Sequence, residues 1–95
     1  MNEMSLEEQI RCMQEMRDYL GEFCKIMQNT MESFQNDIKY LRSYGLPVET
    51  ERNYQQNYFA PANDKVEQVV SDIYQKHIDY IDRVVERLKR AAGEQ

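Results

Sequence analysis

Apolar side chains recur every seven positions through the first half of the chain, and a second apolar series interleaves with them in steps of three and four. The two series consist of Leu6, Met13, Leu20, Met27, Phe34 and Leu41, and of Ile10, Cys24, Met31 and Ile38. This spacing predicts one long helix with an apolar seam along one face, interrupted at Arg17. Ser5 and Glu8 form a capping-box pattern at its start, in which the Ser5 hydroxyl accepts a hydrogen bond from the Glu8 amide. We therefore expect a helix over residues 5–43.

The strongest turn signal of the chain follows this helix, near the midpoint. Gly45 can adopt the left-handed conformation that ends a helix, and Pro47 lacks the N–H group needed to continue one. A turn is therefore predicted over residues 44–48, with Tyr44, Gly45 and Pro47 as its defining residues.

The second half of the chain has helical spacing again, most clearly in its last third. The apolar positions there are Val66, Val69, Val70, Ile73, Tyr74, Ile78, Ile81, Val84, Val85 and Leu88. Tyr54 and Tyr58 lie four apart and would share one helical face. Pro61 disfavours the helical conformation at the residue before it, so either two helices meet there or one helix is kinked. The expected elements are helices over 49–59 and 62–92.

Two long helices joined by a short turn favour an antiparallel hairpin in which the two seams face each other. With 95 residues, three glycines and two prolines, the chain is too short for a second core and too poor in turn residues for a sheet protein. The predicted fold class is all-α: an antiparallel two-helix hairpin that forms a single domain over residues 1–95, with the second helix kinked or broken near Pro61.

A second apolar stripe on the first helix lies about 110° around the helix from the seam, so one neighbouring helix cannot cover both. The stripe and its continuation toward the turn are the candidate partner-binding residues: Cys12, Met16, Tyr19, Phe23, Ile26, Tyr40 and Tyr44. One interpretation is that these side chains broaden the core of the hairpin. The other is an interface that assembles a helical bundle, with another helical protein or with a second copy of the chain. The second is favoured, because monomers rarely expose large contiguous apolar patches and methionine, present six times, adapts to different surfaces.

The charge balance and the cysteines narrow the classes of partner and compartment. Twelve Lys and Arg against seventeen Asp and Glu give a net charge of -5, which argues against a nucleic-acid partner. No apolar run approaches the ~20 residues of a membrane span, and the first residues lack the features of a signal peptide. Cys12 and Cys24 would lie ~18 Å apart on one helix, beyond the reach of a disulfide. We therefore expect synthesis in a reducing cytoplasm, with no membrane span.

Residues that could carry catalysis or hold a metal are scattered along the chain. His77 is the only histidine, and its neighbours four positions away are Ile73 and Ile81. The three glycines are isolated, so no phosphate-binding loop is expected, and a thin hairpin offers no pocket for a catalytic pair of carboxylates. The chain is predicted not to be an enzyme and to use no metal, cofactor or small-molecule substrate.

Ser43, Tyr44 and Gly45 form the predicted turn, and Tyr54 and Tyr58 follow it with aromatic-x-x-x-aromatic spacing. In length and pattern the chain resembles the WXG-type (ESAT-6-like) helical-hairpin proteins of type VII secretion. In that family a Trp-x-Gly turn joins the helices and an aromatic pair often begins the second one. Serine takes the tryptophan position here, with tyrosine next to it.

The aromatic-x-x-x-acid spacing of family members that carry the export signal does not follow Tyr74 or Tyr80, where the fourth residue is Ile78 or Val84. The chain is also similar to the small accessory proteins encoded beside LXG-type toxins, some of which lack that motif. This resemblance implies a non-catalytic chaperone or targeting factor that binds the helical leader domain of an LXG-type effector and helps present it for secretion. It also allows a WXG-like protein that is itself secreted. The alternative is a homodimeric four-helix adaptor or structural module unrelated to secretion.

Overall fold

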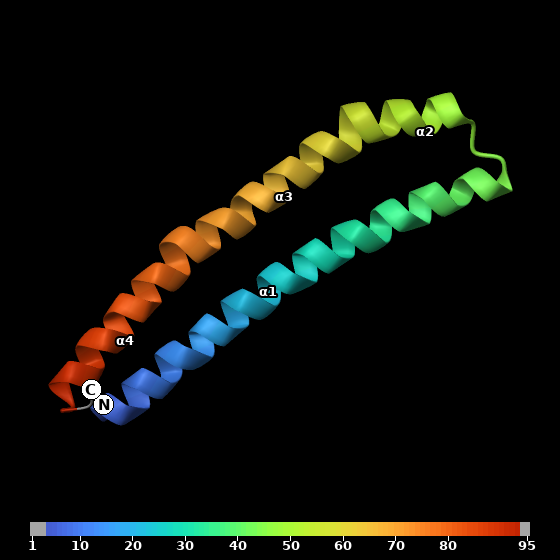
Figure 1. The fold of residues 1–95 in the computed structure, drawn as a ribbon. Helices are drawn as coiled ribbons and strands as arrows, with labels where there is room; N and C mark the ends of the chain where they lie inside the picture. Colours follow the sequence, from blue (N-terminus) through green and yellow to red (C-terminus); the bar gives the residue numbers. More distant parts are fainter. Residues whose placement is uncertain (1–3, 94–95) are drawn as a thin grey trace. The chain divides into compact units, whose positions relative to one another are not determined.

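The computed structural model describes residues 4–93, and nearly all of this stretch is helical. Its elements are α1 (Leu6–Tyr40), the 3-10 turn η1 (Leu41–Tyr44), α2 (Val48–Tyr54), the π-helical turn η2 (Gln55–Phe59), α3 (Ala60–Asp72), the π-helical turn η3 (Ile73–Ile78) and α4 (Asp79–Ala91). Figure 1 shows α1 followed, after one short loop, by the helices of the second half. The protein is therefore an all-α helical hairpin, as the hydrophobic pattern predicts.

The chain packs as two compact units. The first unit contains residues 4–23 and 71–93, which are the beginning of α1 and the end of the second helical half. The second unit contains residues 24–70, which are the rest of α1, the turn, α2, η2 and most of α3. A single domain over the whole chain stays a prediction.

Both ends of the first helical element are capped as the sequence indicates. The Glu8 amide donates to the Ser5 hydroxyl over 3.1 Å. At the other end Gly45 has φ of 105°, and its N–H group donates to the Arg42 carbonyl over 3.2 Å. The Leu46 N–H group donates to the Leu41 carbonyl over 3.1 Å, so the two bonds together form a Schellman motif. This motif stops the helix and allows α2 to begin directly after Pro47.

The first unit is held together by isoleucines from both of its segments. Ile10 of α1 and the residues Ile73, Ile78 and Ile81 of η3 and α4 are buried. The gap that Arg17 leaves in the apolar series is filled by an ion pair, in which Arg17 Nε donates to Asp82 Oδ1 over 2.8 Å. Both side chains are half exposed, so this pair adds little stability and serves mainly to align the two helical segments.

The second unit has a small apolar core. Cys24, Phe59 and Val70 are buried there. Phe34 packs near this core: its ring lies 6.2 Å from the Phe59 ring and 6.3 Å, edge-on, from the Tyr54 ring, measured between centroids. Such aromatic pairs add to the energy of area burial. The turn end of the hairpin is thus closed by aromatic packing.

The second helical half is not broken at Pro61. Ala60 and Pro61 belong to α3, and the departure from α-helical geometry lies just before them, in the π-helical turn Gln55–Phe59. The wider π turn re-spaces the carbonyl groups that an interior proline would otherwise clash with or leave unpaired. Of the two alternatives predicted at this position, two separate helices are therefore excluded by the structure.

Candidate partner-binding surfaces

The second apolar stripe of α1 is exposed in the first unit. Tyr19 is among the most exposed large apolar residues, Phe23 is 50% exposed and Met16 is exposed to the same degree. In an α-helix, residues at these spacings of three and four share one face. The hairpin core does not cover these three side chains, so they are accessible to another molecule.

Met16 also borders a shallow hollow that both segments of the first unit line. The hollow has a volume of about 300 Å³ and is lined by Met16, Lys76, His77, Tyr80 and Ile81. Tyr80 is largely exposed, whereas Ile81 forms the buried floor. This hollow extends the apolar surface from α1 toward α4, a link that the spacing along one helix could not reveal.

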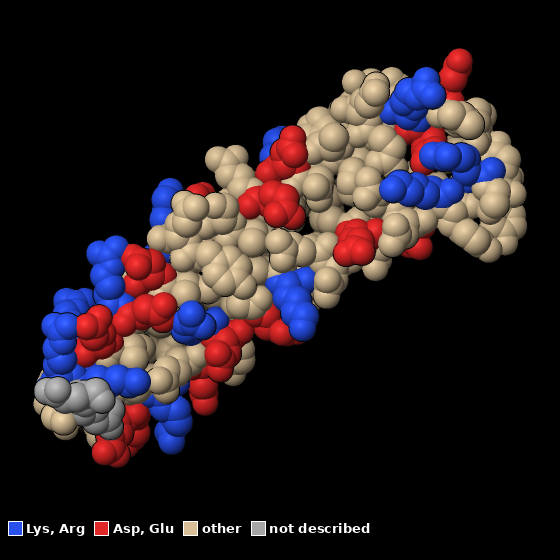
Figure 2. Space-filling view, viewed as in Figure 1, with Lys and Arg blue, Asp and Glu red and all other residues tan. Residues whose placement is uncertain are grey.

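Cys12, the first residue of the stripe, is exposed but does not line the hollow at Met16. It lines a different hollow, of about 210 Å³, together with Met4, Gln9, Met13, Val84 and Leu88. The structure therefore does not bring Cys12 into the hollow that Met16 lines. Away from both hollows, the outer face of α4 is polar and crossed by ion pairs between Arg83 and Asp79 and between Arg90 and Glu86, and Figure 2 shows charges of both signs alternating there.

The second unit exposes three further candidates. Ile26 is exposed on α1, and Tyr40 and Tyr44 are exposed at its end. The two tyrosine rings meet edge to face with centroids 5.1 Å apart, and their hydroxyl oxygens are 2.9 Å apart. This hydrogen bond, and to a smaller extent burial, raises the pKa of Tyr40. Leu41 and Val48 are exposed beside this pair, so the turn end presents an apolar and aromatic tip.

The tyrosines that carry the family resemblance form a second pair in this unit. The Tyr54 and Tyr58 rings are stacked, with centroids 6.1 Å apart and an interplanar angle of 14°. Tyr58 is largely exposed, and Tyr54 is half-buried against Phe34. The spacing of four predicted that the two tyrosines share one helical face, and the structure adds that their rings stack.

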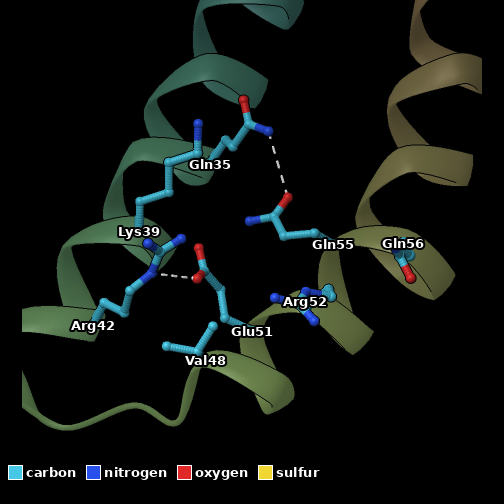
Figure 3. A pocket seen from close by; sticks show the side chains of 8 residues that line it. All are labelled: Gln35, Lys39, Arg42, Val48, Glu51, Arg52, Gln55 and Gln56. Atoms are coloured by element: carbon cyan, nitrogen blue, oxygen red, sulfur yellow. Dashed lines mark hydrogen bonds and ion pairs between the residues drawn. The ribbon is translucent and has the colours of Figure 1, made fainter.

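A polar pocket at the turn end was not predicted from the sequence. Its volume is about 390 Å³, and Gln35, Lys39, Arg42, Val48, Glu51, Arg52, Gln55 and Gln56 line it (Figure 3). Glu51 is only 3% exposed, and its carboxylate accepts from Arg42 Nε over 2.5 Å. Gln35 Nε2 donates to Gln55 Oε1 over 3.4 Å. Polar residues from α1, η1, α2 and η2 thus meet where the apolar seam was expected to continue.

The seven-residue series leaves the inner face toward this end because of helical pitch. Leu41 is exposed, and Phe34 is 43% exposed although its ring still packs against Phe59 and Tyr54. An α-helix repeats every 3.6 residues rather than 3.5, so positions seven apart drift by about 20° per heptad. Four to five heptads along, Gln35 and Arg42 face α2 instead (Figure 3). The drift itself could have been anticipated from the length of the helix.

The chemistry of the described residues is sparse. No group of three or more His, Cys, Asp or Glu within residues 4–93 is arranged to hold a metal ion. Over the same stretch, no helix has both the length and the hydropathy required to cross a bilayer. His77 is exposed at the edge of the Met16 hollow.

The two cysteines differ in accessibility. Cys12 is exposed, whereas Cys24 is fully buried and burial raises the pKa of its thiol. We expect Ellman's reagent to modify Cys12 rapidly in the native chain and Cys24 on the order of 100-fold more slowly, because Cys24 reacts only when the second unit opens. The absorbance of the thiolate that the reagent releases, followed over time, measures the two rates. The fast phase should vanish in Cys12→Ser; its loss in Cys24→Ser instead would contradict the burial.

No protein-family model, curated protein or solved structure matches this chain.

Proposed function

We propose that this chain is a non-catalytic helical partner protein of a type VII secretion system. It binds the helical leader domain of an LXG-type effector toxin, keeps that domain folded and helps present it to the secretion machinery. The protein partner replaces solvent over apolar side chains that the hairpin leaves uncovered.

The observation that carries this proposal is the exposure of Met16, Tyr19 and Phe23 on one face of α1. Removing apolar area from water contributes roughly 25 cal/mol per Å² before the entropic cost of association is subtracted, and buried aromatic side chains often dominate the binding energy. A second helical chain is the natural cover, because a helix presents side chains at the same spacing of three and four. The stacked Tyr54 and Tyr58 and the glycine turn support the family in which such partners occur.

The direct test is co-expression with the leader domain of an LXG-type toxin encoded beside this chain. We expect one stable complex, whose mass by size-exclusion chromatography with light scattering is the sum of one copy of each chain. A monomer that ignores the leader would overturn the proposal. A dimer of this chain that excludes the leader would overturn it in favour of the homodimeric four-helix module.

Phe23→Asp is expected to abolish the complex, because it places a charge in the centre of the covered face. Phe23 is half exposed in the free chain, so the circular dichroism of the variant should stay helical. Gln14→Asp is the matched control, since Gln14 is exposed on the same helix but lies outside the apolar stripe. Equal loss of binding in both variants would show that helix stability, not the stripe, controls the assembly.

A further inference from the structure

The turn-end pocket of the second unit is lined by a buried carboxylate and three cations. Glu51 is 3% exposed, and Arg42 contacts it with Nε. Lys39 and Arg52 line the same pocket, and neither forms an ion pair with the described residues. The lining thus carries three cations and one carboxylate, a surplus of two positive charges in a chain whose net charge is -5. Figure 2 shows Lys and Arg side chains gathered at this end.

Hydrogen-bond donors in the pocket are left without acceptors. Gln55 Nε2 is buried and has no hydrogen-bond partner among the described residues. Figure 3 shows this amide group facing the space between the two helices, on the side of Arg42 and Glu51. The side-chain hydrogen bonds of residues 4–93 use the Arg42 guanidinium only through Nε, so its terminal nitrogens can still donate. Buried donors in native proteins are normally paired, so an acceptor that enters this pocket would gain the unused Gln55 donor.

The helix dipole explains the position of some of these cations but not of all. Lys39 and Arg42 lie near the carboxyl end of the first helical element, where cations interact favourably with the helix dipole. Arg52 lies in α2, and the dipole provides no acceptor for Gln55. The dipole therefore accounts for two of the charges but not for the arrangement of donors.

We propose that this pocket binds the carboxylate of an acidic side chain, Asp or Glu, carried by the partner chain. A carboxylate accepts from a planar guanidinium and an amide at once, and its single charge is outweighed by the cation surplus. The Glu51 carboxylate repels a doubly charged free anion more strongly than it repels a singly charged carboxylate. Val48 lines the pocket and is 51% exposed, so a carboxylate mounted on an apolar helix gains an apolar contact that a free anion does not. The inference rests on the proposed function, since it names the chemistry of the same partner.

The test uses the isotope-labelled full chain and NMR. Acetate is the minimal probe, titrated at constant ionic strength, with inorganic phosphate as the competing free anion. We expect saturable shifts of the Gln55 side-chain NH2 signals and of the Arg42 and Arg52 Nε–H signals with acetate. A short helical peptide with one glutamate among leucines should saturate the same signals at lower concentration than the peptide with glutamine in its place.

The double variant Lys39→Gln with Arg52→Gln should weaken binding of acetate and of the glutamate peptide about tenfold, because both free cations are lost. Lys25→Gln with Lys65→Gln is the matched control: it removes two exposed charges of the same unit outside the pocket. Equal weakening in the control, or shifts that never saturate, would overturn the proposal. Phosphate binding more tightly than the glutamate peptide would overturn it in favour of a free-anion site.

The two proposals fail separately. A chain that binds the leader domain but shows no saturable shift with carboxylates overturns the pocket alone. A chain whose pocket binds acetate and the glutamate peptide but that ignores every leader domain overturns the proposed secretion partner alone.

Discussion

Ile81→Ala is expected to lower the free energy of unfolding by about 3 kcal/mol, the usual cost of truncating a fully buried isoleucine. Ile81 is 1% exposed and is one of the two most deeply buried side chains described. The substitution removes three methyl or methylene groups and leaves a cavity that two packed helices close only in part. A chain of this size has only a few kcal/mol of stability, so a large unfolded fraction should be present at 25 °C. Urea titration followed by circular dichroism measures the loss.

Ile26→Ala is the matched control for this prediction. Ile26 is 54% exposed, so its truncation in the isolated chain should change the free energy of unfolding by less than about 1 kcal/mol. Both variants need measuring at two protein concentrations, because self-association would add stability by mass action. Equal losses for Ile26 and Ile81 in a monomer would mean that the exposed stripe belongs to the core.

The second large effect is expected at the buried ion pair, and it is asymmetric. Arg42→Met should cost about 2 kcal/mol, because it leaves the Glu51 carboxylate buried without its cation. The usual cost of breaking a buried pair is larger, but Arg42 is 51% exposed, so solvent already screens part of the interaction. Glu51→Gln should cost less than about 1 kcal/mol, since the amide still accepts a hydrogen bond and Arg42 remains hydrated.

A double-mutant cycle checks this asymmetry. Arg42→Met combined with Glu51→Gln should be more stable than Arg42→Met alone, because the uncompensated charge is gone. Chemical denaturation of the four chains provides the free energies. A larger loss of stability in Glu51→Gln than in Arg42→Met would contradict this prediction. It would mean that the unpaired Arg42 guanidinium, and not the unpaired Glu51 carboxylate, is the costly charge.

The exposed stripe of α1 shows which contacts can be predicted from helical spacing and which cannot. The angle between the stripe and the seam follows from 100° per residue, so the spacing predicts that the stripe does not point at the same neighbour as the seam. It does not predict that Met16 borders a hollow with Tyr80, because that contact joins residues far apart in the chain. The binding role of the stripe stays a prediction.

The π-helical turn Ile73–Ile78 accommodates a spacing of buried residues that does not fit a regular α-helix. Ile73 and Ile78 are both buried although they lie five positions apart. A regular α-helix would rotate such a pair apart, whereas the π turn Ile73–Ile78 keeps both on the inner face. In the sequence, the corresponding signal is the spacing of five between these two isoleucines.

Glu51 illustrates what no local pattern indicates. In the sequence it is one acidic residue among several in a short helix, and acidic residues are normally exposed. Its burial depends on Arg42, nine positions earlier and on the other side of the Gly45 turn. The Schellman motif at this turn brings the two helices close enough for the pair to form.

Local sequence patterns are enough to predict that this protein is helical, where its turn lies and which apolar positions can share a face. These properties follow from backbone hydrogen bonding, from the conformational freedom of Gly45 and from a period of 3.6 residues, all of which act within a few residues. The tertiary structure brings Gln35 and Arg42 into the turn-end pocket and leaves Leu41 exposed, while Phe34 still packs against Phe59. It also decided that a carboxylate is buried at the turn end and that the hollow at Met16 includes residues of the other helix. Such outcomes depend on the pitch accumulated along α1 and on the side chains of a second helix, which no window of neighbouring residues contains.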